Sequence, residues 1–151
     1  IRIPHFKSGA FKNSATREDI VNAGKESVRK AGGKDTPDGL MLNIPAFGDV
    51  IVVGRRGLKH GLRPFGKNYG HLENIDNADI MPVVGEILKN SVPVNEVRPH
   101  EGQGTDGATI LFGAAFDERG NLVPVVSVVN HFRDTETPAR GRLSRCSHST
   151  P

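Results

Sequence analysis

Two long apolar runs separated by a short polar turn dominate the C-terminal half of the sequence. The runs span residues 108–116 and 122–132, and between them lies Asp117-Glu-Arg-Gly-Asn121. Gly and Asn accept backbone conformations that tight turns require, so the pattern predicts a β-hairpin. Because two strands joined by a tight turn run antiparallel, this feature constrains the chain to a fold with an antiparallel sheet.

A helix is predicted near the N-terminus. Thr16 is followed three residues later by Asp19, a spacing that resembles a capping box, although Glu or Gln is the usual residue at the second position. The pair Gly32-Gly33 predicts where the helix ends. Residues 34–39, which are rich in turn formers, predict a loop.

Four further strands or helices are predicted ahead of the hairpin. Residues 40–44 predict a short strand, and residues 50–53, which are β-branched throughout, predict a buried one. Apolar residues at offsets of three and four predict a second helix within residues 76–90. Residues 92–97 predict a short edge strand, because Pro93 cannot donate a ladder hydrogen bond.

These elements predict an α+β fold in which N-terminal helices pack on an antiparallel β-sheet that ends in the long hairpin. The length of 151 residues is that of one domain. We expect an extended lead-in over residues 1–13, a single α+β domain over residues 14–133 and a loosely ordered basic tail over residues 134–151. The sequence starts with Ile1 rather than Met, so we expect a fragment of a larger protein.

Composition limits the kinds of site that the chain can carry. Its one cysteine, Cys146, excludes an intramolecular disulfide and a cysteine-based zinc cage. No apolar run approaches membrane-spanning length, so no membrane partner is expected, and no motif indicates a cofactor or a metal. The net charge of +3 permits a nucleic-acid partner without requiring one.

The basic segment of residues 55–69 holds five Lys or Arg residues, no acidic residue and His60. Neighbouring cations disfavour a charged imidazole, which would keep His60 available as a neutral base near pH 7. The same cations could bind a phosphodiester and stabilise negative charge in its transition state. The alternative is a histidine in a solvated basic turn. His71 and His100 lie in predicted loops, where a surface histidine without a role is the commoner case.

His131 is the second candidate, at the end of the predicted strand 122–132. Strict alternation places it on the same face as Ser127, and Thr109 could supply another hydroxyl on the same sheet. Its alternative role is to close the edge of an apolar core. Two imidazoles acting as base and acid suit RNA cleavage, in which the 2′-OH attacks its own phosphate without a metal.

Three parts of the sequence together resemble a known nuclease superfamily. They are Val50-Ile-Val-Val-Gly-Arg-Arg-Gly-Leu-Lys-His-Gly, the predicted helix at 80–88 and the hairpin at 109–131. They resemble the barnase/EndoU/colicin/RelE-like superfamily, and within it most nearly the domains of large polyvalent proteins of phages and conjugative elements. The resemblance covers roughly residues 49–133, and the Lys59-His60 dipeptide is its most specific part.

The resemblance implies a metal-independent ribonuclease fold whose sheet carries polar catalytic residues. By position, Lys59 and His60 match the Lys-His motif, Arg56 would bind phosphate, and His131 matches loosely as a polar residue on a late strand. No catalytic Ser, Thr or Tyr on a last strand can be matched. RNA would be the substrate, an immunity or antitoxin protein a further partner, and the cytoplasm of the producing or target cell the location.

Two functions from different classes therefore follow from the sequence. The first is a toxin-type ribonuclease that leaves a 2′,3′-cyclic phosphate and a 5′-OH end. The second is a non-catalytic module that binds nucleic acid or another part of a larger polyprotein. A third chemistry, ADP-ribosyl transfer, lacks a Glu at a suitable strand end.

Overall fold

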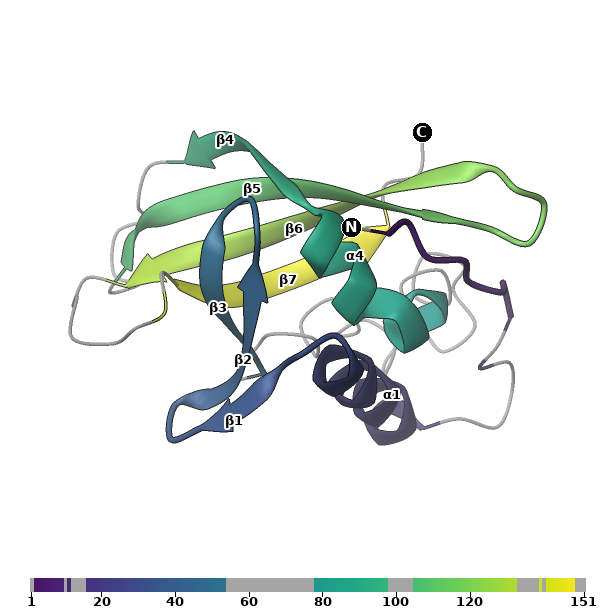
Figure 1. The fold of residues 1–151 in the computed structure, drawn as a ribbon, viewed down its shortest axis with the longest axis horizontal. Coiled ribbons are helices and arrows are strands. Elements are labelled where there is room, and N and C mark those ends of the chain that lie inside the picture. Colours follow the sequence, from purple (N-terminus) through teal and green to yellow (C-terminus); the bar gives the residue numbers. More distant parts are fainter. Residues whose placement is uncertain are drawn as a thin grey trace.

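The computed structural model describes residues 2–9, 11, 16–53, 78–97, 105–132, 139 and 141–148. These residues form a seven-stranded sheet with the strand order β1-β2-β3-β7-β6-β5-β4 and helices packed against one of its faces (Figure 1). The architecture is α+β, as predicted. The elements are α1 (Arg17–Lys30), β1 (Lys34–Thr36), β2 (Gly39–Ile44), β3 (Gly48–Val53), the 3₁₀ turn η2 (Met81–Val83), α4 (Val84–Asn90), β4 (Val92–Val97), β5 (Thr105–Phe116), β6 (Leu122–Phe132) and β7 (Gly141–His148).

Helix α1 begins at the capping box that the sequence predicts. The backbone N–H of Asp19 donates to Thr16 Oγ1 at 3.2 Å, and the backbone N–H of Thr16 donates to Asp19 Oδ2 at 3.0 Å. Both donors would otherwise lack a partner at the helix start. The helix ends before Gly32, whose φ of 105° turns the chain out of the helix, as predicted.

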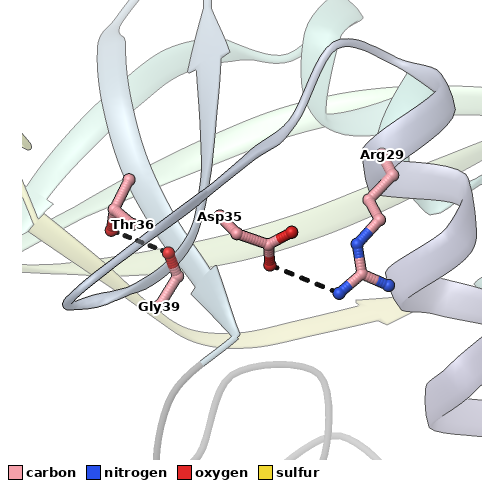
Figure 2. A network of polar contacts seen from close by, with 4 residues as sticks. All are labelled: Arg29, Asp35, Thr36 and Gly39. Atoms are coloured by element: carbon pink, nitrogen blue, oxygen red, sulfur yellow. Dashed lines mark hydrogen bonds and ion pairs between the residues drawn. The ribbon is translucent and has the colours of Figure 1, made fainter.

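The predicted loop at residues 34–39 instead contains strand β1, which forms a hairpin with β2. Thr36 Oγ1 donates to the carbonyl of Gly39 at 2.8 Å, and an Arg29–Asp35 ion pair of 3.3 Å links α1 to β1 (Figure 2). The ion pair is largely exposed to solvent, so it contributes little to stability. The sequence identified the turn residues correctly but missed the short strand beside them, because pairing with β2 stabilises it.

The predicted second helix is present, in two parts. Residues 81–83 form the 3₁₀ turn η2 and residues 84–90 form α4. Pro82 stands in the first positions of η2, where the N–H that proline lacks would have no intrahelical partner. The buried side of α4 consists of Val84, Gly85, Ile87 and Leu88.

Strands β5 and β6 form the predicted hairpin, with β5 starting three residues earlier than expected, at Thr105. In the turn, the backbone N–H of Asp117 donates to the carbonyl of Asn121 at 3.0 Å. The carboxylate of Asp117 accepts from the backbone N–H groups of Asn121 and Arg119 at 2.8 and 2.9 Å. These bonds, with the one from Asn121 as the largest cause, lower the pKa of the carboxyl.

Strand β7 corrects the prediction of a loosely ordered tail over residues 134–151. Residues 141–148 pair antiparallel with β6 and parallel with β3, so β7 lies inside the sheet and the sheet is mixed rather than purely antiparallel. The prediction that the sheet ends in the β5–β6 hairpin is therefore wrong, because β7 follows the hairpin and belongs to the same sheet. The segment is rich in Ser and Arg, and its apolar side chains Leu143 and Cys146 are fully buried in the core.

The core lies between the helices and the inner face of the sheet, meaning the face that the helices cover. Within the described residues, no helix is long and apolar enough to cross a membrane. The largest fully buried core side chains come from α1, β2, the η2–α4 region, β5 and β7: Ile20, Leu42, Ile44, Ile80, Met81, Ile87, Leu88, Leu111 and Leu143.

Where β5 extends beyond β4, its backbone groups form hydrogen bonds with the side chain of Asn90 and with the backbone of the N-terminal segment. Asn90 donates to the carbonyl of Ala114 at 3.0 Å and accepts from its N–H at 3.0 Å. Further along, the N–H of Phe6 donates to the carbonyl of Phe116 at 2.9 Å, and the N–H of Phe116 donates to that of Pro4 at 2.8 Å. Part of the predicted lead-in therefore extends the sheet.

Candidate active site

Of the four predicted catalytic residues, three lie outside the described residues and one lies within them. Arg56, Lys59 and His60 lie outside the described residues, as do His71 and His100. Among the predicted catalytic residues, only His131 belongs to the part of the chain that the structure describes.

His131 stands near the end of β6 on the inner face of the sheet. Ser127 and Val129, which precede it at two-residue spacing, are fully buried, whereas Val126, Val128 and Asn130 on the other face are half-buried. This alternation confirms the face that the sequence predicts for His131. His131 itself is half-buried, and is therefore less enclosed than Ser127 and Val129 on the same face.

Thr109 of β5 contacts the His131 ring directly. Its Oγ1 lies 2.6 Å from His131 Nε2, a short hydrogen bond, and the side chain is only 2% exposed. Thr109 pairs with Val129 across the ladder, so His131 is its diagonal neighbour, two residues further along β6. The antiparallel register therefore brings together two polar side chains that are 22 residues apart in the sequence.

The other side of the His131 ring faces Phe47, from the turn between β2 and β3. The two ring centroids are 6.5 Å apart and their planes are inclined by 27°. In β7, the residue that pairs with His131 is Gly141, which brings no side chain to this part of the inner face. A Cβ on Gly141 would collide with the carbonyl oxygen of Asn130 and crowd Val129, so only glycine fits this position without a shift.

This arrangement assigns different surroundings to the two ring nitrogens of His131. Nε2 is hydrogen-bonded to a buried hydroxyl, whereas Nδ1 has no hydrogen-bond partner among the described residues. A hydroxyl both donates and accepts, so Thr109 can hold the ring in its neutral and in its charged form. An imidazole that is held at one nitrogen and has no described partner at the other is suited to proton transfer.

Two further reactive groups on the inner face are too deeply buried to meet a substrate. Ser127 and Cys146 pair across β6 and β7, and both are 0% exposed. Burial raises the pKa of the Cys146 thiol to about 11, and the neighbouring Ser127 hydroxyl has a smaller influence that lowers it. The thiol is therefore neutral near pH 7 and a poor nucleophile.

Metal chemistry has no visible site in the part of the chain that the structure describes. No three His, Cys, Asp or Glu side chains come together there in a group that could hold a metal ion. The site around His131 offers the hydroxyl of Thr109, the imidazole of His131 and the aromatic ring of Phe47.

Sequence reasoning identified some of this site and missed the rest. It named Thr109 as a hydroxyl on the same sheet as His131, but it did not predict their hydrogen bond, because the bond depends on the exact register of β5 and β6. Phe47 and Gly141 were missed altogether. Glycine between two arginines, at 140 and 142, was a weak signal for a position that tolerates no side chain.

Comparison with known proteins gives no relative from which a function could be transferred: no family model, no curated protein and no solved structure matches the chain significantly.

Proposed function

We propose that this chain is a metal-independent ribonuclease, with His131 as one of its two proton-transfer groups. The observation that carries the proposal is the hydrogen bond of 2.6 Å between Thr109 Oγ1 and His131 Nε2, on a half-buried imidazole whose Nδ1 has no partner among the described residues. General acid–base catalysis needs an imidazole that is held in place and still reachable.

The reaction needs no co-reactant beyond the RNA. A base takes the proton of the 2′-OH, the 2′-oxygen forms a bond to the adjacent phosphorus, and the bond from phosphorus to the 5′-oxygen breaks. An acid gives its proton to that leaving oxygen. The products are a 2′,3′-cyclic phosphate and a 5′-OH end. His131 is proposed as the acid and His60 as the base, with Lys59 and Arg56 binding the phosphate.

The roles of His60, Lys59 and Arg56 rest on the sequence and its resemblance to the nuclease superfamily. The role of His131 rests in addition on its position beside Thr109. A positioned imidazole contributes about 10²–10⁴-fold to the rate of proton transfer. We therefore expect His131→Ala to lower RNA cleavage by at least about 100-fold.

The test is cleavage of a defined RNA oligonucleotide by the purified chain in the presence of EDTA, with the ends of the products identified. His131→Ala and His60→Ala should abolish cleavage, while the parent leaves a cyclic phosphate. His5→Ala is the matched control, because His5 is exposed and its ring packs against that of Phe116, with the centroids 5.2 Å apart.

Activity that disappears with EDTA and returns with a divalent ion would contradict the metal-independent mechanism. Full activity of a folded His131→Ala variant would remove His131 from the mechanism. Binding of the oligonucleotide without any cleavage by the parent would instead favour the non-catalytic nucleic-acid-binding module.

A further inference from the structure

We propose that Thr109 is a positioning residue, which occupies Nε2 of His131 so that Nδ1 is the atom that gives the proton to the leaving oxygen. This inference rests on the proposed ribonuclease function and names the atom through which it works. Thr109 is 2% exposed, so it acts through His131 rather than by touching RNA.

The backbone around Thr109 is fixed on both sides. It pairs with Val129 of β6 and with Glu96 of β4, so Thr109 lies in the interior of a three-strand ladder. A β-branched side chain has few χ1 rotamers available, and burial restricts it further. The position of Thr109 Oγ1 is therefore restricted, and its hydrogen bond of 2.6 Å to Nε2 restricts the orientation of the His131 ring. The Phe47 ring limits rotation from the other side.

These contacts determine which proton of the charged His131 ring can be transferred. In the charged ring both nitrogens are donors, so Nε2–H donates to Thr109 Oγ1 and Nδ1–H points away from it. When the bond from phosphorus to the 5′-oxygen breaks, that oxygen takes the Nδ1 proton. The ring that remains is neutral and still donates through Nε2–H. No bond to Thr109 has to break during the step.

The experiment uses the full chain with ¹⁵N-labelled histidine, and it combines NMR of the ring nitrogens with RNA cleavage kinetics. The neutral His131 of the parent should be the Nε2–H tautomer. Thr109→Val, which removes the hydroxyl and keeps the shape, should give a mixture of tautomers. It should lower kcat by about 10- to 100-fold with KM unchanged, because a misplaced catalytic group can cost about 10²-fold.

Two further variants separate positioning from a general effect on the fold. Thr109→Ser keeps the hydroxyl and should restore both the single tautomer and most of kcat. Ser127→Ala removes another inner-face hydroxyl, which is fully buried and lies four residues before His131 along β6, and should leave tautomer and kcat as in the parent. Thermal unfolding of each variant checks that it is folded.

The outcomes distinguish failure of this inference from failure of the proposed function. An Nδ1–H tautomer in the parent, or an unchanged tautomer and kcat in folded Thr109→Val, would overturn the role of Thr109. If the parent does not cleave RNA, the proposed function fails, and the assignment of Nδ1 as the acid atom fails with it. In that case the NMR result decides only whether Thr109 fixes the ring.

Discussion

At the scale of single residues, burial decides what each polar side chain on the inner face of the sheet can do. Thr109, Ser127 and Cys146 are all buried, but Thr109 differs because its partner is the half-buried His131. The Ser127 hydroxyl and the Cys146 thiol are both fully buried in the core, out of reach of a substrate. The same hydroxyl chemistry beside an accessible imidazole can contribute to proton transfer.

The buried thiol of Cys146 makes the stability of the chain depend on pH in the alkaline range. Folding raises the pKa of this thiol from 9.0 to about 11, so the folded chain keeps a proton that the unfolded chain releases. Stability is then fully present below pH 9 and falls as the pH rises toward 11, by about 2–3 kcal/mol in all. Urea unfolding at several pH values measures this loss.

Cys146→Ala is the matched control for that titration, because other groups also ionise above pH 9. The difference in unfolding free energy between parent and variant should shrink between pH 9 and pH 11. A constant difference would mean that the thiol does not stay protonated in the folded chain. Below pH 9 the variant should be less stable, since it replaces a fully buried side chain by a smaller one.

At the scale of elements, one glycine sets how closely the two helices approach. The backbone N–H of Gly85, in the first turn of α4, donates to Ser27 Oγ of α1 at 2.9 Å in a buried contact. A Cβ on Gly85 would collide with the carbonyl oxygen of Ser27. The absent side chain therefore lets backbone meet backbone where the helices cover the sheet.

We expect Gly85→Ala to destabilise the chain by about 1–3 kcal/mol. Alanine is the better helix former by about 1 kcal/mol, so this change would be stabilising if propensity alone decided. The collision with α1 should outweigh that gain. The free energy of unfolding in urea is the measurement.

Asn22→Ala gives the comparison for Gly85→Ala, because Asn22 is exposed on α1 and its replacement tests helix propensity without a collision. It should leave stability unchanged or raise it slightly. If Gly85→Ala also raised stability, the helices would have room to separate, and the close contact would not be a requirement of the fold.

At the scale of the whole molecule, β7 joins two parts of the sheet that are distant in sequence. On one side it pairs with β3, which continues into β2 and β1, and on the other with β6, which continues into β5 and β4 (Figure 1). Without β7, the described sheet would consist of two separate three-stranded pieces. Its fully buried Leu143 and Cys146 also belong to the common core.

A chain that ends at residue 133 should therefore fail to fold cooperatively. It would leave β3 and β6 with unpaired edges and remove buried side chains from the core, and exposed strand edges promote aggregation. Circular dichroism during thermal unfolding and size-exclusion chromatography would show the loss. Leu143→Ala in the full chain removes one buried side chain and keeps the strand pairing of β7. It should lower the free energy of unfolding by about 2–5 kcal/mol. A sharp unfolding transition of the shortened chain would contradict the central role of β7.

What the sequence by itself determined is what short-range chemistry encodes. Thr16 and Asp19 predicted the start of α1, the turn at residues 117–121 predicted the β5–β6 hairpin, and two-residue alternation predicted the face of His131. In each case the interacting groups are close in the chain, or the period of the strand alone decides. The same reasoning named Lys59 and His60, which stay predictions because they lie outside the described residues.

Only the tertiary structure decided where β7 pairs and what surrounds His131. Residues 141–148 carry few apolar side chains, so no local pattern marked them as a strand between β3 and β6. The contacts of His131 with Thr109 and Phe47 join β6 to β5 and to the turn between β2 and β3. Such contacts form after long stretches of chain have been brought together, and their geometry depends on register and packing, which no short window of sequence contains.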